Sequence, residues 1–489
     1  MTTRGERRRR VASGKQEEQD MVQATALPRN EAGIEAAIGV LKQRFGDQLQ
    51  TGQAIREQHG HTTTWINTQA PDAVAFPTST EEVASIVKTC AKYGVPVIPF
   101  GTGTSLEGHV NAPAGGICVD MMRMDQILKV NAEDLDVVVQ PGVTREQLNT
   151  FLRDQGLFFP IDPGANASLG GMAATRASGT NAVRYGTMKD NVLALEVVMA
   201  DGEVIRTAQR AKKSSAGYDL TRLMVGSEGT LGLMTEITLR LQGIPEAIRS
   251  ARCSFRSVDD ACRAVMMTIQ YGIPVARMEL LDEMSVAAAN SYSKLSLPET
   301  PLLLLEFHGS DAGVLEQSET FAAIADEFGG FDIEATSSAE ERNKLWQARH
   351  DMYWACMQIR PGTKGISTDV CVPISKLAEC VGATQAKAEE LGLIAPVVGH
   401  VGDGNFHSLV LVDMDSAEER RKADEFVSWL NDLAISLEGT CTGEHGIGQG
   451  KRPYLQKELG VATRYMAAIK AALDPDDILN PGKILSDRG

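Results

Sequence analysis

Two glycine-rich segments constrain the fold of this chain more than any other feature. The first, GTGTSLEG at 101–108, follows an apolar run typical of a short strand, and the second spans residues 162–191. Small and hydroxyl residues in the first segment can turn successive backbone N–H groups towards an anion: Gly101, Thr102, Gly103, Thr104 and Ser105. Either segment alone is typical of ordinary turns. Two in one region favour an extended diphosphate cofactor over a lone phosphate.

The first segment does not match the nicotinamide-binding fingerprint G-x-G-x-x-G. That fingerprint needs a third glycine where a helix opens, because the helix N-terminus meets the pyrophosphate and the glycine allows close packing. Here Leu106 occupies the third position, and the following GHVNAPAGG is incompatible with a helix. Asp120, 19 residues after Gly101, reproduces only the spacing of a ribose-binding acid. The sequence therefore disfavours NAD.

A second group of chemically active residues lies near the C-terminal end. GHVGDGNFH places His400 and His407 seven residues apart across a Gly-Asp-Gly turn, and TGEHGIG adds Glu444 and His445. Two imidazoles and one carboxylate form a three-ligand set that leaves coordination positions open for a substrate. Neighbouring side chains alternate along an extended segment, so we expect Glu444 and His445 to point to different sides. We assign Glu444 as ligand and His445 as base, because imidazole titrates near neutrality; the exchanged roles stay open.

Composition excludes several classes of protein. With 48 basic and 64 acidic residues, the formal net charge of −16 argues against binding to nucleic acid or anionic lipid. No stretch approaches the roughly 18 consecutive apolar residues of a membrane span, so we expect a soluble or peripheral protein. The 8 cysteines contain no C-x-x-C pair and indicate buried, reduced thiols. We interpret the polar N-terminal stretch around Arg7 to Arg10 as a disordered tail, with a mitochondrial presequence as the alternative.

Apolar periodicity outlines two folded units. It predicts a helical region over 31–60 and a helix opened by Thr80 or a neighbouring hydroxyl residue. Repeated strand-then-turn patterns indicate an α+β domain over 65–243. A second unit of helices and strands begins near 245 and ends near 455.

Together these motifs resemble the FAD-linked oxidases of the vanillyl-alcohol-oxidase type, and within them the D-2-hydroxyacid dehydrogenases, most closely the D-lactate dehydrogenase (cytochrome) group. The resemblance extends from about residue 60 to 485 and rests on ordered motifs: PFGTGTSLEG, VVVQPGVT, the 162–191 segment, GSEGTLG, WQARH, STDVCVP, GHVGDGNFH, CTGEHGIG and LNPGKIL. It implies an α+β fold with a PCMH-type FAD-binding domain of two α+β subdomains and a cap domain with an antiparallel sheet and helices. The expected division is a disordered tail over 1–30, the FAD-binding domain over 31–245, the substrate or cap domain carrying the metal site over 246–455, and a C-terminal segment over 456–489 that returns to the FAD-binding domain.

The resemblance also implies the site residues. We expect noncovalent FAD, because relatives that attach their flavin use a histidine in the first loop, whereas here His109 lies beyond it. The implied FAD contacts are Gly101, Thr102, Gly103, Thr104, Ser105, Gly108, Pro141, Gly142, Ser168, Gly171, Ser178, Gly179, Gly186, Glu228, Gly229 and Asn480. The family's metal ligands fall on His400, His407 and Glu444, its ion is zinc or manganese, and its catalytic base falls on His445. Arg349 matches the substrate-carboxylate residue, and Lys364 is a further catalytic cation.

The implied reaction is oxidation of D-lactate or a related D-2-hydroxy acid to pyruvate or the matching 2-oxo acid, with hydride transfer to flavin N5; a carbanion route uses the same residues and stays open. Similar D-2-hydroxyglutarate dehydrogenases carry an asparagine where this chain has Leu409, which favours lactate or a more apolar acid. Glycolate, as in the FAD subunit of glycolate oxidases, stays open. Electrons would pass to cytochrome c, a quinone or another carrier protein. The expected location is the cytoplasm, with peripheral contact at the inner membrane as an alternative, or the mitochondrion if the chain is eukaryotic.

Two alternatives come from other classes. A metal-dependent hydrolase could use His400, His407, Glu444 and a bound water, with the glycine loops holding a phosphate group. A noncatalytic FAD- or metal-binding subunit is the other. Intact His445 and Arg349 argue against that second alternative.

Overall fold

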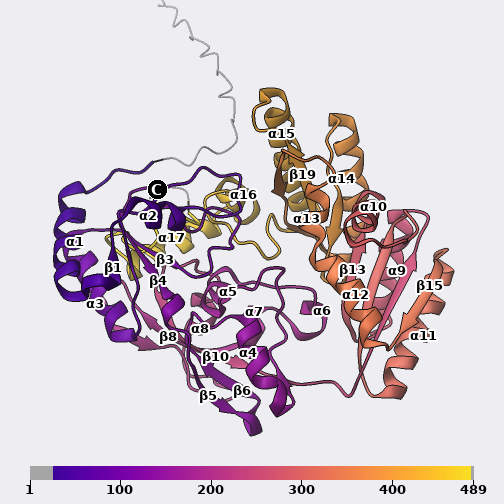
Figure 1. The fold of residues 1–489 in the computed structure, drawn as a ribbon, viewed down its shortest axis with the longest axis horizontal. Coiled ribbons are helices and arrows are strands. Elements are labelled where there is room, and N and C mark those ends of the chain that lie inside the picture. Colours follow the sequence, from indigo (N-terminus) through magenta and orange to yellow (C-terminus); the bar gives the residue numbers. More distant parts are fainter. Residues whose placement is uncertain (1–25, 486–489) are drawn as a thin grey trace, which may run out of the picture.

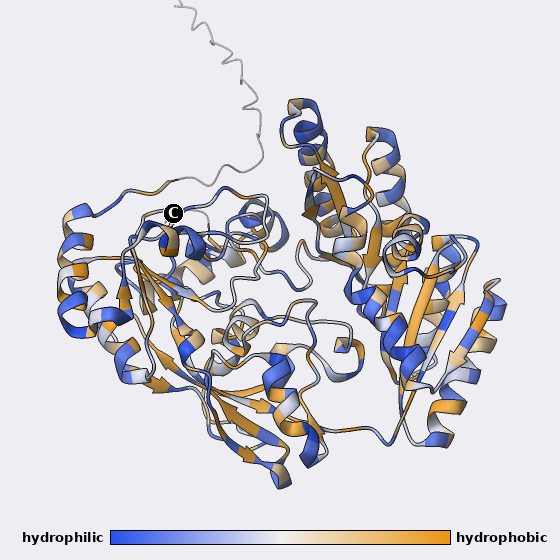
Figure 2. Ribbon diagram, in the orientation of Figure 1, coloured by the Kyte–Doolittle hydropathy of each residue, from blue (hydrophilic) through white to orange (hydrophobic). Residues whose placement is uncertain are grey.

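The computed structural model describes residues 26–485 and arranges them in two lobes (Figure 1). The N-terminal lobe contains residues 26–243 together with the returning residues 452–485. The cap lobe contains residues 247–436. Hydrophobic strands run through the middle of both lobes, and the helices turn hydrophilic residues outward (Figure 2).

The first layer of the N-terminal lobe is a four-stranded sheet in the order β1-β2-β4-β3. Its strands are β1 (Leu49–Gln50), β2 (Ala73–Ala75), β3 (Val97–Phe100) and β4 (Ile117–Asp120), accompanied by helices α1 (Glu31–Phe45), α2 (Gln53–Gly60) and α3 (Thr80–Tyr93). Ser79 caps α3 by accepting the backbone N–H of Glu82, so the predicted hydroxyl cap is the residue next to Thr80. The helical region predicted over 31–60 is confirmed as two helices, α1 and α2, which Gly46 at φ +53° and β1 separate.

The second layer of this lobe is a five-stranded antiparallel sheet in the order β5-β6-β10-β8-β9. Its strands are β5 (Ile127–Asn131), β6 (Asp136–Val139), β8 (Val192–Val198), β9 (Val204–Arg206) and β10 (Leu233–Arg240). The connecting helices are α4 (Arg145–Leu152), α5 (Leu169–Thr175), α6 (Ala182–Tyr185), α7 (Met188–Asn191) and α8 (Leu220–Met224), and β7 (Leu157–Phe158) pairs with β11 (Gln242–Gly243). The two predicted α+β subdomains correspond to these two sheets.

The cap lobe is built on an antiparallel sheet in the order β15-β12-β14-β13-β18-β19-β16, with β17 also paired to β19. Its strands are β12 (Ala247–Ser254), β13 (Val275–Leu281), β14 (Leu302–Gly309), β15 (Phe331–Thr336), β16 (Lys364–Ser367), β17 (Val370–Cys371), β18 (Val397–Gly399) and β19 (Asn405–Val412). Its helices are α9 (Val258–Gln270), α10 (Glu283–Ser293), α11 (Asp311–Glu327), α12 (Ala339–His350), α13 (Met352–Met357), α14 (Leu377–Leu391) and α15 (Ala417–Ser436). The antiparallel sheet that the family resemblance implied is confirmed.

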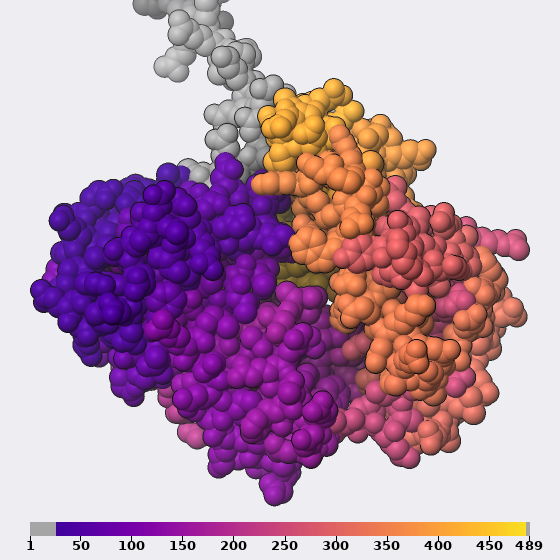
Figure 3. Space-filling model, viewed as in Figure 1, coloured from indigo at the N-terminus to yellow at the C-terminus, as the bar shows by residue number. Residues whose placement is uncertain are grey.

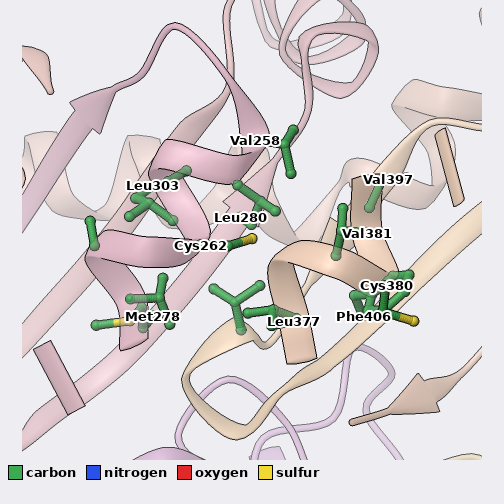
Figure 4. Close-up of a cluster of buried hydrophobic side chains, with 14 of the residues drawn as sticks. Val258, Cys262, Met278, Leu280, Leu303, Leu377, Cys380, Val381, Val397 and Phe406 are labelled. Carbon is green, nitrogen blue, oxygen red and sulfur yellow. The ribbon is translucent and has the colours of Figure 1, made fainter. Parts of the chain in front are cut away.

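Side chains along β19 alternate between the two faces of the cap sheet, one packed into the hydrophobic core and the other directed towards the candidate site. Phe406 and Val410 of β19 belong to a large core with α9 and α14 (Figure 4). Leu409 belongs to a second, smaller core with residues of α10, α12 and α13, so it faces the opposite side of the sheet. Because side chains two residues apart share a face, His407 lies on the same side as Leu409. The sheet therefore supports the site from a strand that is buried along its whole length.

The lobes abut over a broad boundary (Figure 3) and are tied together by returning chain. After α15 the chain passes through α16 (Arg452–Leu459) and α17 (Ala462–Leu473) beside the N-terminal lobe. Val97 of β3 then donates its N–H to Ile478 and accepts one from Asn480, at 2.7 and 2.9 Å. The carboxylate of Glu228 accepts the N–H groups of Ile447 and Gly448, at 2.7 and 2.8 Å.

The terminal predictions divide between described and undescribed residues. Residues 1–25 of the predicted disordered tail lie outside the described part of the chain. For residues 26–30 the prediction is wrong: Leu27 donates its N–H to Pro113, Arg29 pairs with Asp72 at 2.9 Å, and Asn30 caps α1. These contacts fix the segment against the first sheet.

Two further expectations concern membranes and thiols. Between residues 26 and 485, none of the helices combines the length and apolar character needed to cross a bilayer. All eight cysteines are free thiols, and all are buried except Cys371, which is half-buried. The prediction of reduced thiols, buried in seven of the eight cases, is confirmed.

Candidate active site

A cavity of about 590 Å³ lies between the two lobes. The N-terminal lobe contributes the loop after β3, the start of α5 and the loop before β10. The cap lobe contributes the end of α12, part of α13, and residues of β19 and the segments beside it. The glycine-rich segments and the candidate metal ligands therefore meet at one cavity.

Most of the predicted cofactor contacts line this cavity: Gly101, Thr102, Gly103, Thr104, Ser105, Pro141, Ser168, Gly171, Glu228, Gly229 and Asn480. The chain segments approach closely here, because a Cβ at Gly101 would lie 2.2 Å from Ser168 Oγ. A Cβ at Gly229, whose φ is +72°, would lie 2.2 Å from Pro99 Cγ. The buried hydroxyl of Ser105 has no hydrogen-bond partner within residues 26–485. The cavity wall here exposes backbone groups and an unpaired hydroxyl, which can form hydrogen bonds with a long polar cofactor such as FAD.

Some predicted cofactor residues lie outside the cavity lining: Gly108, Gly142, Ser178, Gly179 and Gly186. Gly142 and Gly179 allow two chain segments to cross closely, since their Cβ atoms would lie 2.5 Å from Met121 O and 2.4 Å from Asp162 O. Gly179 has a φ of +146°. The glycine pattern alone does not separate residues that face a ligand from residues that face another part of the chain.

Asn480 and Glu228 line the cavity while also bracing it. Asn480, at φ +41°, donates from its side-chain amide to His109 O and Glu228 O, at 3.1 and 2.8 Å. The Glu228 carboxylate is used by the two backbone donors of Ile447 and Gly448. Glu228 thereby holds the segment that carries His445.

His400, His407 and Glu444 converge at one wall of the cavity. The Nε2 atoms of His400 and His407 lie 3.2 and 3.3 Å from Glu444 Oε1, and the three possible ligand atoms lie within 4.8 Å of one another. The Nδ1 atoms are used elsewhere: that of His400 contacts Glu279 Oε1 at 2.7 Å, and that of His407 donates to Thr368 O at 2.9 Å. This leaves both Nε2 atoms as ligands. Glu444 Oε2 is buried with no hydrogen-bond partner in the described chain, and the donor set fits zinc or manganese.

The charges of these groups suit a cation. Burial alone would raise the pKa of Glu444, but His400 and His407 lower it, so the carboxylate stays ionised. Burial alone would lower the pKa of His400, but Glu279 and Glu444 raise it well above its usual value. A cation has to displace the proton that His400 holds, so the affinity for a cation should fall as the pH decreases.

His445 is placed beside this cluster in a neutral form. Its ring stacks on that of His407, with centroids 5.1 Å apart and planes at 10°. Burial lowers the pKa of His445 to about 4. Its buried Nδ1 has no hydrogen-bond partner within 26–485 and lies 3.9 Å from Asp369 Oδ2. An unprotonated, unpartnered imidazole at a cavity wall can accept a proton.

Residues 441–450 are irregular rather than extended, so the strand alternation from which we expected different directions for Glu444 and His445 is absent, and both residues line the cavity. Asp369 organises this segment by accepting the N–H groups of Glu444 and His445 at 3.0 and 2.8 Å, and the Thr442 hydroxyl at 2.8 Å. Burial alone would raise the pKa of Asp369, but nearby imidazoles and Lys451 hold it well below its usual value. Asp369, His407 and His445 form a second group with metal-binding spacing, which keeps the exchanged roles of Glu444 and His445 open.

The two predicted cations lie in different places. Arg349, at the end of α12, lines the cavity, and its Nε and Nη2 contact Glu279 Oε2 at 2.8 and 2.7 Å. Lys364 is exposed at the far end of β16, opposite Val412, and does not line the cavity. The antiparallel register carries it away from His407, so the structure does not bring the predicted catalytic cation Lys364 to the site.

Sequence reasoning missed two carboxylates that hold the site together, Glu279 and Asp369. Both are fully buried, and each contacts residues that are distant in sequence. A charged residue inside an apolar strand, as in ARMELLD and STDVCVP, is the signal that could have found them.

Comparison with known proteins covers both lobes. The family described as FAD linked oxidases, C-terminal domain, matches residues 244–484, and an FAD binding domain matches residues 71–208. A probable mitochondrial D-lactate dehydrogenase of Danio rerio is 49% identical over 459 residues, which are 93% of this chain and 92% of that protein. The mitochondrial D-lactate dehydrogenase [cytochrome] of Arabidopsis thaliana is 47% identical over 92% of this chain and 80% of its own length.

Solved structures identify the fold. The structure of p-cresol methylhydroxylase with bound substrate superposes with a TM-score of 0.78 at 17% sequence identity, covering 94% of this chain and 99% of that one. The arrangement of two α+β subdomains and a cap is therefore the PCMH-type fold. Sequence matches over both lobes and a cavity suited to FAD agree: the chain belongs to the FAD-linked oxidases, as an FAD-dependent 2-hydroxyacid dehydrogenase of the D-lactate dehydrogenase (cytochrome)-like group.

Proposed function

We propose that the chain oxidises D-lactate, or a closely related D-2-hydroxy acid, to pyruvate or the matching 2-oxo acid with the help of FAD and a divalent cation. One observation carries this proposal: the ligand trio, a neutral imidazole and an arginine line the same cavity as the cofactor loops. An acid held there would present its carboxylate, its hydroxyl and its reacting carbon to different protein groups at once.

The chain's own residues have separate roles in this proposal. Arg349 binds the substrate carboxylate through the guanidinium N–H groups that Glu279 does not use, which fixes the orientation of the acid. His445 accepts a proton from the substrate, because burial keeps its imidazole neutral at pH 7. His400, His407 and Glu444 would hold zinc or manganese, and the loops around Gly101 and Gly229 would hold FAD.

The bound groups contribute chemistry that no side chain provides. When bound, FAD supplies a two-electron acceptor, and the cation supplies Lewis acidity at the substrate hydroxyl. Closing the acid between the two lobes excludes water and orients the reacting carbon, which can contribute several kcal/mol to the lowering of the barrier.

An apolar part of the cavity wall favours a small or apolar substrate. Leu409 is 6% exposed and lines the cavity together with Val398 and Met352. A second substrate carboxylate beside these groups would lose its hydration without gaining a partner. This supports lactate over 2-hydroxyglutarate, whereas glycolate fits the same wall with fewer contacts.

Two relatives named as mitochondrial, one of them as a cytochrome-linked enzyme, support electron transfer from the flavin to a carrier protein such as cytochrome c. A quinone is the alternative acceptor. A mitochondrial location in a eukaryotic host, with peripheral membrane contact, is part of the same proposal.

The test is spectroscopic. Purified protein reconstituted with FAD should show flavin absorption in the visible range, and D-lactate added without oxygen should bleach it, while L-lactate should not. Removing metal with a chelator should slow the bleaching, and zinc or manganese should restore it. A flavin that D-lactate leaves oxidised in the metal-loaded protein would refute the proposal, as the hydrolase alternative predicts.

A further inference from the structure

One buried carboxylate joins the candidate metal site to the candidate substrate anchor. Glu279 lies near the end of β13, and its side chain is 0% exposed. Its Oε1 is 2.7 Å from His400 Nδ1, while its Oε2 is 2.8 Å from Arg349 Nε and 2.7 Å from Arg349 Nη2. Each oxygen is thus used by a different functional residue.

The sheet determines this position. In the antiparallel register, Leu280 of β13 lies opposite Gly399 of β18, so the next pair along brings Glu279 to His400. Leu281 belongs to the core that packs against α12 and α13. Glu279, two residues earlier, points to the same side, which is where Arg349 ends α12.

A carboxylate without exposure is stabilised only by its partners. Donors of His400 and Arg349 meet both oxygens of Glu279, which offsets the cost of burying the charge. By accepting the Nδ1 proton of His400, it leaves Nε2 free for a cation. By accepting two N–H groups of Arg349, it fixes the plane of the guanidinium and leaves the remaining donors for an acid.

We propose that Glu279 is a positioning residue that sets the tautomer of His400 and the orientation of Arg349 together, so that cation binding and substrate binding depend on one side chain. This inference rests on the proposed function, because it assigns His400 to the cation and Arg349 to the substrate. Glu279 acts through His400 and Arg349 without touching the substrate.

Amide and apolar replacements separate the two tasks of Glu279. Glu279→Gln keeps one oxygen and turns an N–H group towards the other partner, so it can satisfy His400 or Arg349 but not both. Glu279→Leu removes both acceptors at similar volume. Glu279→Asp keeps both oxygens on a shorter side chain and should restore part of each function.

Glu306 offers a matched control on the adjacent strand. It is 4% exposed, its Oε1 contacts His308 Nε2 at 2.8 Å, and Arg277 lies 3.7 Å away. This is also a buried glutamate with a histidine and an arginine, but it does not contact the ligand trio. Glu306→Gln and Glu306→Leu therefore measure how the loss of a buried carboxylate changes stability when the ligand trio keeps its contacts.

The experiment measures zinc affinity of the FAD-loaded protein by competition with a chelator, and kcat and KM for D-lactate at saturating zinc. Glu279→Leu should lower zinc affinity about 10–100-fold and raise KM roughly tenfold. Glu279→Gln should impair at least one of the two, Glu279→Asp should lie between it and the wild type, and the Glu306 variants should change neither. Flavin content and thermal stability are recorded for every variant.

Three results would overturn the inference. The first is a Glu279→Leu protein whose zinc affinity and KM for D-lactate are both unchanged. The second is a Glu279→Leu protein in which only one of these two quantities changes. The third is a set of Glu306 variants that lose as much zinc affinity and gain as much KM as Glu279→Leu. If Glu279→Leu does not fold, Glu279→Gln with both quantities unchanged overturns it. His400→Ala distinguishes a failure of the proposed metal site from a failure of the positioning role. If His400→Ala keeps its zinc, the assigned metal site is wrong. If His400→Ala loses its zinc while the Glu279 variants behave like the wild type, only the positioning role is refuted.

Discussion

The N-terminal lobe presents mainly backbone and small residues to the cavity, whereas the cap lobe presents side chains that are held by other side chains. In the N-terminal lobe the important feature is the absence of side chains at positions such as Gly101 and Gly229, where a Cβ would collide with a neighbouring segment. In the cap lobe it is a buried network in which Glu279 and Asp369 orient His400, Arg349 and the segment around His445. A long cofactor can be held by many weak backbone contacts, but chemistry on a small acid requires a few groups in fixed positions.

The largest expected effect comes from the segment that Asp369 of the cap lobe holds in place. His445→Ala should slow flavin reduction by D-lactate about 10²–10⁴-fold, because the proton acceptor is lost. Flavin content and zinc content should stay unchanged, since neither is held by this side chain. Stopped-flow absorbance and metal analysis check both. Reduction at the wild-type rate would show that the base lies elsewhere, with Glu444 in the exchanged role as the first candidate.

The corresponding change in the N-terminal lobe should reverse this pattern. Gly229→Ala adds a Cβ against Pro99 and should weaken FAD binding about tenfold by shifting the loop, while the rate of reduction of the remaining bound flavin stays similar. Gly156→Ala is the control: its φ of +69° matches the +72° of Gly229, but no atom lies within 4 Å of its Cβ. Both variants should lose about 1–2 kcal/mol of stability from an alanine at positive φ, and Gly229→Ala should lose more because of its contact with Pro99. Equal FAD affinity in the two, measured by fluorescence titration, would remove the distinction between the lobes.

A third variant tests the apolar wall of the cap. Leu409→Asn should raise the ratio of kcat/KM for D-2-hydroxyglutarate to that for D-lactate by roughly tenfold, because a polar partner becomes available to a second carboxylate. The cost is about 2–3 kcal/mol of stability from placing an amide in a buried cluster. Leu411→Asn, on the same face and 1% exposed but outside the cavity lining, should show the same loss with no change in selectivity. A selectivity ratio that moves equally in both variants would count against a specific role for Leu409.

The last test, which concerns no residue of the cavity, compares how tightly the two lobes pack around their buried thiols. Burial raises the pKa of Cys90 in the N-terminal lobe and of Cys253 in the cap lobe to about 12. A raised pKa favours the protonated thiol, so at pH 8 only about 10⁻⁴ of each is thiolate. Modification by a disulfide reagent should therefore be at least about 100-fold slower in the native protein than in guanidinium, in both lobes. Fast labelling confined to one lobe would identify it as the looser one.

The family resemblance, which rests on ordered local motifs, was sufficient for the fold class, and the glycine runs and the His-x₆-His spacing indicated residues that gather at the cavity. The sequence could not separate Gly101, which lines the cavity, from Gly142 and Gly179, which allow two segments to cross. Both uses require the same absence of a side chain. The resemblance also implied Lys364 as a catalytic cation, but the antiparallel pairing of β16 with β19 places this residue opposite Val412 and outside the cavity lining.

Glu279 and Asp369 remained hidden for a related reason. Their partners are 121 and 76 residues away in the chain, for His400 and His445 respectively, so no local spacing links them. Only strand register brings Glu279 to His400. The helical region predicted over 31–60 is interrupted for a local reason, because one glycine at φ +53° ends α1.

The contact from Glu228 to Ile447 and Gly448 has a consequence for making hybrids of related enzymes. A chimera joined near residue 244 would take this glutamate from one parent and the amides that it clasps from the other. Any residue except proline supplies such an amide, so an exchange between relatives should keep this contact when both parents carry a glutamate at position 228 and a 440–450 segment of the same backbone conformation. The unit to be exchanged therefore extends across the boundary between the lobes.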